Sequence, residues 1–396
     1  MAAATLAQPA IAQKLIDRDK PKTDPANDPY TRGGDPELVK AVGYVSMKDM
    51  EFGPTGETSG SIGAFLSFVD LRFIETEHFR LGIALPKIKV TGSERDKLRE
   101  ELTRLKESLP DIDPRIRVLD PWLRAHLYAQ RLEEHYAKIQ TFLGVTQDQF
   151  TGTAEGWDGT GKYMGIGPHM GQSGKYEVVL FPSLGAHREF MGKKLGLTSK
   201  LTQQHNYIDR DSLAIIIHTD QDGLRVDEAL HGHLVHSLTQ TLLKGYKHYS
   251  YEPPIWVIEG CAHYFERQLN PRFNSFTSSE GGAPIRIRKE DWNEPVKKMV
   301  SSKKAPSIAS IMSKRAFAEL DKNDHLFSWA LIDYLETAHP GFLIKYFDLI
   351  SALKNDEGID DASEMLNVQR TLFKEELGMN YPEFDRAWAA WVEENY

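Results

Sequence analysis

Apolar residues in the first half of the chain come first in short runs and then in stripes with helical spacing. The short runs lie between residues 62 and 90, and one of them, His78–Leu85, predicts a β-strand. Further on, leucines recur every three or four residues, as on one face of an α-helix. These leucines are Leu98, Leu102, Leu105 and Leu109. A second stripe begins after Asp120-Pro121 and ends at Gly144, so it predicts another amphipathic helix.

The second half of the chain changes from strands to helices. Apolar runs predict strands at Tyr176–Phe181 and Ser212–His218, with a helix near Ala186–Leu195 between them. Helical stripes then follow at Asp227–Leu243 and Ile255–Leu269. We therefore predict an α+β fold, with a mixed sheet before these two helices and a mainly helical C-terminal half.

The start of the chain has a different composition. Residues 19–36 are crowded with Pro, Asp and Gly, so residues 1–36 are expected to form a disordered tail or linker. The Ala10-Ile11-Ala12 step resembles a signal-peptide cleavage site and favours export to the periplasm or the cell exterior. No basic segment precedes it, so a cytoplasmic protein is the alternative. The rest divides into an N-terminal α+β region, 37–172, and a second domain, 173–396.

Charge and cysteine content exclude several classes of protein. The chain has 48 Lys and Arg against 57 Asp and Glu, a net charge of −9, which argues against general nucleic-acid binding. The single cysteine, Cys261, rules out an intrachain disulfide and a cysteine-rich metal site. The longest aliphatic stretch, 213–217, is far shorter than the ~20 apolar residues that span a bilayer. Any metal site must therefore use histidine and carboxylate ligands, and no transmembrane segment is expected.

Histidines are concentrated in one part of the chain. Seven of the 14 lie within residues 205–263, and chance placement of solvated or hydrogen-bonded histidines is the simplest alternative explanation. On the predicted helix Asp227–Leu243, His233 and His236 share one face, because three residues correspond to 300° of turn. His231 points elsewhere unless Gly232 distorts the helix. His233 and His236 are therefore a candidate pair of metal ligands.

The next predicted helix carries a matching set of side chains. Glu259, His263 and Glu266 follow at i, i+4 and i+7 and so share one face. Gly260 would allow another helix to approach closely. If this face packs against His236, Glu259 could supply an oxygen ligand, and His263 or Glu266 could support the ligands. The alternative is a solvated face of a charged helix.

These two segments resemble gluzincin metallopeptidases, the group of thermolysin and the aminopeptidases. The resemblance rests on Gly232-His233-Leu234-Val235-His236, followed after a gap by Trp256–Glu266. The family carries H-E-x-x-H on one helix and E-G-x-A-x-[YF]-x-E on the next. Further similarity extends downstream through Pro306-Ser307-Ile308 and the last helices. The resemblance implies that residues 173–396 form a zincin-like peptidase domain with a cleft.

The resemblance also implies roles for single residues. His236 matches the second zinc-binding histidine and Glu259 matches the glutamate ligand, whereas Gly232 stands in place of the first histidine. His233 stands in place of the general-base glutamate, so it could act as a ligand beside His236 and Glu259 or as the base, but not both. His325 lies near the place where relatives often carry a tyrosine that stabilises the oxyanion. His233 and His325 are thus the candidate catalytic residues.

Together these features predict a peptidase-like protein that is not a conventional peptidase. We expect it to bind a peptide or protein in its cleft, which either holds zinc or is free of metal. The competing hypothesis is a metal-dependent hydrolase or zinc peptidase with an altered site made of His233, His236 and Glu259.

Overall fold

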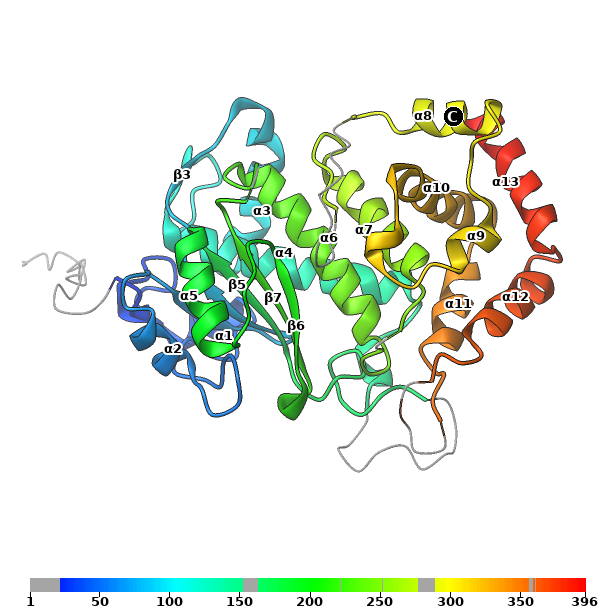
Figure 1. Cartoon of the computed structure of the whole chain (residues 1–396). Coiled ribbons are helices and arrows are strands. Elements are labelled where there is room, and N and C mark those ends of the chain that lie inside the picture. Colours follow the sequence, from blue (N-terminus) through cyan, green and yellow to red (C-terminus); the bar gives the residue numbers. More distant parts are fainter. Residues whose placement is uncertain are drawn as a thin grey trace, which may run out of the picture.

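The computed structural model has an α+β fold, as predicted, with a mixed five-stranded sheet and a large helical part (Figure 1). The described residues are 22–151, 163–221, 223–250, 252–276, 289–355, 359 and 361–396. The Ala10-Ile11-Ala12 step therefore lies outside the described residues. None of the described helices is long and apolar enough to cross a membrane.

The central sheet has the strand order β1-β2-β5-β7-β6. Its strands are β1 (Arg72–Glu75), β2 (Phe79–Ile83), β5 (Tyr176–Phe181), β6 (Gln203–Tyr207) and β7 (Ser212–His218). Strands β2, β5 and β7 are parallel, while β1 and β6 run antiparallel at the two edges. The predicted bounds of β5 and β7 are confirmed. Strand β6 was not predicted, because its polar sequence carries no apolar alternation.

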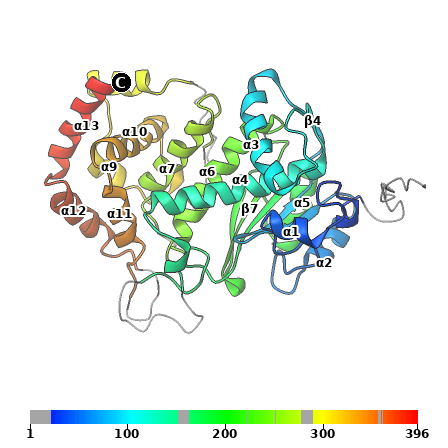
Figure 2. The ribbon, with the colours of Figure 1, turned by 180° about the vertical axis from the view of Figure 1, so that it is seen from behind.

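Helices cover both faces of the sheet. Alternate side chains of a strand point to opposite faces, so Val179 packs toward α2 (Ser59–Phe65) and α5 (Leu184–Lys194), and Val178 packs on the other side. That other side is covered by α4 (Pro121–Phe142), which Figure 2 shows running across the molecule. The sheet is therefore buried on both faces.

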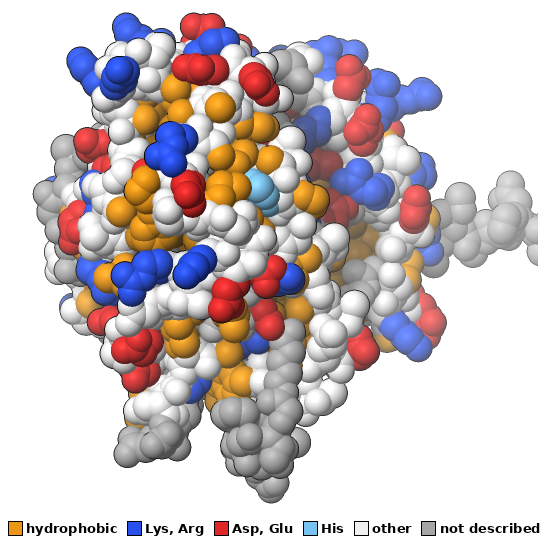
Figure 3. Space-filling model, turned by 90° about the vertical axis from the view of Figure 1, so that its right-hand side faces the viewer, with side chains coloured by type: hydrophobic (Ala, Val, Ile, Leu, Met, Phe, Trp, Pro, Cys, Tyr) orange, Lys and Arg blue, Asp and Glu red, His pale blue; other side chains and the backbone are white. Residues whose placement is uncertain are grey.

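The C-terminal half is helical, as predicted (Figure 1). Its helices are α6 (Asp227–Gly245), α7 (Ile255–Leu269), α8 (Asn293–Ser301), α9 (Ile308–Met312), α10 (Lys322–Ala338), α11 (Phe342–Ile350), α12 (Met365–Glu376) and α13 (Tyr381–Asn395). Helix α7 packs between α6 and α10. On the face that carries α12 and α13, acidic and basic side chains are interspersed with hydrophobic ones (Figure 3).

The remaining elements belong to the N-terminal region. They are α1 (Pro36–Ala41), α3 (Arg95–Ser108), and the short strands β3 (Ile88–Lys89) and β4 (Val118–Leu119). Part of the predicted tail is folded here, since Asp28 is buried and its Oδ2 lies 3.0 Å from His126 Nε2 of α4. The pairing of β2 with β5 also joins the predicted N-terminal region and the predicted second domain in one sheet.

A buried ion network positions α6 on α4. Asp227, the first residue of α6, accepts hydrogen bonds at 2.8 Å from both Arg124 and Arg131 of α4. Arg131 also donates to Glu101 of α3. Buried charges are retained only when they are paired, so this network holds the start of α6 in one position relative to the sheet.

Candidate metal centre

The candidate centre lies where α6 and α7 pack together. The face of α7 that carries Glu259, His263 and Glu266 meets His236 of α6, as the helical spacing predicted. His236 Nδ1 lies 3.2 Å from Glu266 Oε2, and His236 Nε2 lies 3.7 Å from Glu259 Oε2. Both carboxylates therefore flank one imidazole ring.

Helix α10 adds a third histidine, His325, to this group. Gly260 permits its close approach, because a Cβ atom there would lie only 2.6 Å from the carbonyl oxygen of Ser328. As a result, His325 Nδ1 lies 3.1 Å from Glu259 Oε1 and 3.1 Å from His263 Nε2. His263 Nε2 itself lies 3.3 Å from Glu259 Oε1. The close helix approach that Gly260 suggested is thus made by α10.

All five side chains of this group are buried. None of His236, Glu259, His263, Glu266 and His325 is more than 3% exposed. Buried carboxylates and imidazoles must find partners within the protein, because burial without compensation is costly. We refer to these five residues as the His/Glu cluster.

Electrostatic coupling in the cluster is strong. Burial by itself would lower the pKa of His236, but Glu259 and Glu266 outweigh it and raise this pKa to about 10. Burial would raise the pKa of Glu266, yet His236 brings it down to about 2. The pKa of Glu259 is likewise held well below its usual range by His236, against the effect of burial. Both carboxylates are therefore ionised at neutral pH.

His233 lies outside the cluster although it is on the same helix as His236. Its Nε2 lies 2.7 Å from Thr202 Oγ1, and its Nδ1 lies 2.9 Å from Ser275 Oγ. Burial, followed by the charge of His236, lowers the pKa of His233 to about 4, so the ring is neutral. The predicted set of His233, His236 and Glu259 is thus not brought together around one point, and His233 as a ligand or base stays a prediction.

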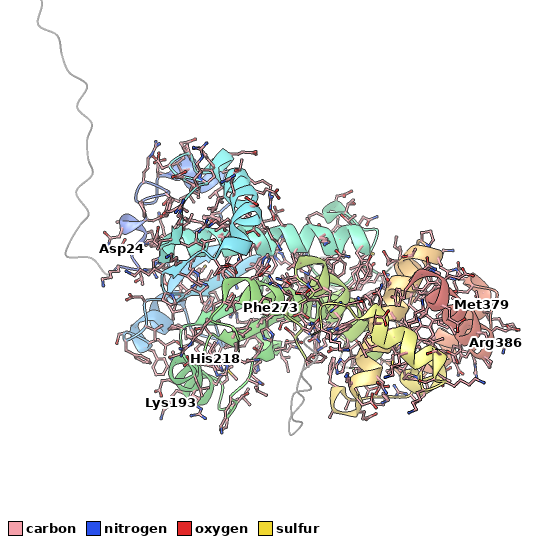
Figure 4. The ribbon with its side chains drawn as sticks, turned by 90° about the horizontal axis from the view of Figure 1, so that it is seen from above. Asp24, Lys193, His218, Phe273, Met379 and Arg386 are labelled. Atoms are coloured by element: carbon pink, nitrogen blue, oxygen red, sulfur yellow. The ribbon has the colours of Figure 1, made fainter. Side chains whose placement is uncertain are left out.

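The segment after α7 connects His233 to the cluster. Ser275 donates to Glu266 from its backbone nitrogen at 2.9 Å and from its hydroxyl at 2.6 Å. Seen from above, Phe273 of this segment lies between the half that contains the sheet, marked by His218, and the helical half, marked by Met379 (Figure 4). Ser275 therefore satisfies one side of Glu266 while it binds His233.

The side chain of Glu266 lies next to Gly232, which has no side chain of its own. A Cβ atom at Gly232 would lie 3.7 Å from Glu266 Cγ and 3.8 Å from Glu266 Oε1. The Glu266 carboxylate thus lies beside the position at which the family resemblance would place a histidine. His231 is no substitute for that ligand, because its Nδ1 faces Glu101 at 3.9 Å.

Gln240 is a site residue that the sequence analysis missed. It lies one helical turn after His236, and its Nε2 donates to Glu259 Oε2 at 2.5 Å. The same nitrogen lies 3.1 Å from His236 Nε2. The amide therefore bridges the two residues that match zinc ligands of gluzincins. Its i+4 spacing from His236 is the signal that could have identified it.

Two overlapping groups in the cluster could hold a metal ion. One consists of His236, His263 and Glu266, and the other of Glu259, His263 and His325. Among the described residues, His236 Nδ1, Glu259 Oε1 and His263 Nδ1 are buried without a hydrogen-bond partner. Imidazole and carboxylate donors suit zinc and related divalent ions, so the cluster fits such a metal.

Comparison with known proteins adds no relative. No protein-family model matches the chain, and a search of curated proteins returned no match. Function must therefore be argued from the cluster and its surroundings.

Proposed function

We propose that this protein is a gluzincin-like, metal-binding protein that has lost conventional peptide hydrolysis and binds an extended peptide in its cleft. The observation that carries this proposal is the His/Glu cluster, whose five buried side chains include three polar atoms that find no hydrogen-bond partner among the described residues. A divalent cation would compensate the charge of the buried carboxylates and bind donor atoms of the cluster.

The loss of hydrolysis is argued from α6, the helix that carries Gly232, His233 and His236. Gly232 supplies no ligand, and Gln240 bridges His236 and Glu259 with its amide. A metallopeptidase needs an open coordination position for water and a base beside it. His233 has both ring nitrogens against hydroxyl groups, and the cluster side chains are buried, which supports the lack of a free base and of a solvent-accessible water position.

Peptide binding is argued from the edge of the sheet. Within the described part of the chain, β6 pairs on one side only, with β7, and most of it is partly exposed. It also lies along α6, because Gln204 donates to Gln240 at 2.5 Å. An extended peptide can add to such an edge through main-chain hydrogen bonds.

Metal content and peptidase activity test the first part of the proposal. The purified full chain is saturated with Zn²⁺, freed of excess ion, and measured for bound metal and for cleavage of a mixed fluorogenic peptide library. We expect about one ion per chain, as one occupied three-ligand set predicts, and no metal-dependent cleavage. Absence of bound metal would overturn the proposal, and metal-dependent cleavage would replace it with the altered-site hydrolase.

Hydrogen exchange tests the peptide site. A peptide selected from a random library should slow exchange of the amides in Gln203–Tyr207 when it binds. Protection confined to another element would contradict binding along β6.

A further inference from the structure

We propose that the metal is held between α7 and α10 by Glu259 Oε1, His263 Nε2 and His325 Nδ1, and not on α6. This inference rests on the proposal that the cluster binds a metal, and it names the ligands. Glu259 and His263 are one turn apart on α7, and His325 comes from the first turns of α10. Two of these three residues, His263 and His325, do not match metal ligands in the sequence resemblance.

The three donor atoms have the spacing of a metal site. Their separations are 3.3 Å between Glu259 Oε1 and His263 Nε2, and 3.1 Å from His325 Nδ1 to each of them. Donors about 2.0–2.1 Å from a tetrahedral zinc ion lie about 3.3–3.4 Å apart. The triangle therefore matches one face of such a tetrahedron with little adjustment.

Protons cannot satisfy this triangle. Three short contacts join the donors, but the two imidazole nitrogens carry at most one proton each, so at most two of the three contacts can be hydrogen bonds donated by the imidazoles. Glu259 Oε1 is buried and has no hydrogen-bond partner among the described residues. A cation at the centre would satisfy all three contacts at once.

The surroundings of the triangle suit a closed metal site. Gln240 donates to the other oxygen of Glu259 and so fixes the carboxylate. The rings of Phe276 and Trp292 lie 5.1 and 5.0 Å from the ring of His263, and Phe276 lies 4.8 Å from His325. These aromatic rings lower the polarity around the triangle, which strengthens binding of a cation to a carboxylate.

The competing set is less favourable. His236, His263 and Glu266 would use the other nitrogen of His263, with 3.2 and 3.6 Å between Glu266 Oε2 and the two Nδ1 atoms. Glu266 Oε2 already accepts a hydrogen bond at 2.9 Å from the backbone nitrogen of Ser275, with which a metal would have to compete. Glu259 Oε1 has no such bond.

Substitution of single histidines separates the two sets. The full chain is stripped with a chelator and titrated with Co²⁺, whose visible absorption reports tetrahedral coordination, and then with competing Zn²⁺. We expect His325→Ala to weaken binding at least tenfold and to abolish the tetrahedral spectrum, while His236→Ala keeps both. His135→Ala, which removes a buried histidine outside the cluster, is the matched control.

The outcomes are distinguishable. Binding that survives His325→Ala but is lost in His236→Ala would overturn this inference and leave metal binding by the cluster intact. Absence of Co²⁺ and Zn²⁺ binding to the unsubstituted chain would overturn both proposals. If His325→Ala does not fold, as judged by circular dichroism, His325→Gln provides the same comparison, because it keeps most of the side-chain volume and removes the imidazole ligand.

Discussion

At the scale of single residues, a histidine joins the site only if its side chain also points toward the carboxylates of the cluster. His233 and His236 are three residues apart on one helix, yet only His236 reaches the carboxylates. His233 is held between Thr202 and Ser275. A helical face spans a wide arc, so two side chains on it can serve different partners. The partners available in space, and not the spacing, decide which histidine joins the cluster.

Substitution of His233 by glutamine should therefore leave metal binding unchanged. The change removes contacts to two hydroxyl groups, which should cost about 1–2 kcal/mol of unfolding free energy. Metal content of the purified variant and its urea unfolding curve measure the two effects. A His233→Gln protein that folds but binds no metal would instead support His233 as a ligand.

At the scale of elements, the site depends on how closely α10 approaches α7. Gly260 makes this approach possible, because its backbone lies against Ser328 and Ile332 of α10. Gly232 of α6 looks similar in sequence but has ordinary space around it, with its nearest side-chain neighbour, Glu266, at 3.7 Å. The two glycines thus differ in what they do, although both lie inside helices that carry cluster residues.

Alanine at these two positions should have opposite effects on stability. Gly260→Ala forces α7 and α10 apart and should lower the unfolding free energy by about 1–3 kcal/mol. Gly232→Ala fits without strain and should raise it by about 0.5–1 kcal/mol, because glycine weakens a helix interior. Urea unfolding of both variants checks this, and equal stability of the two would contradict the role assigned to Gly260.

At the scale of the whole molecule, the packing of helices against the sheet buries histidines to which the described part of the chain supplies no carboxylate partner. His135 of α4 is 6% exposed, and its Nε2 lies 2.8 Å from Thr239 Oγ1 of α6. Burial lowers the pKa of His135 from 6.5 to about 3. The contact of α4 with α6 therefore requires this ring to stay neutral.

Acid should weaken the fold through this residue. Between pH 6.5 and 3 the unfolded chain binds a proton at His135 that the folded chain does not, so the unfolding free energy falls as the pH falls. One such group contributes a slope of about 1.4 kcal/mol per pH unit. Urea unfolding at pH 7, 6 and 5 should show a smaller slope in His135→Gln, and the difference should approach that amount between pH 6 and 5, where the histidine of the unfolded chain is mostly protonated. The same pH dependence of the unfolding free energy in the unsubstituted protein and in His135→Gln would contradict this role of His135.

The sequence by itself determined the elements and part of the cluster. Helix α7 begins and ends where its apolar stripe predicted, and β5 and β7 also match their predicted bounds, because periodicity reflects local backbone geometry. The common face of Glu259, His263 and Glu266 follows from the helical repeat alone.

Only the tertiary structure decided which residues complete the cluster. His325 lies 62 residues beyond His263, and its approach depends on the contact of α10 with Gly260. The edge strand β6 was missed because its polar sequence carries no periodic signal of burial. Gln240 was missed although it lies four residues after His236, because its contact partner, Glu259, lies on another helix. Side-chain partners between distant elements are set by packing, which spacing along the chain does not encode.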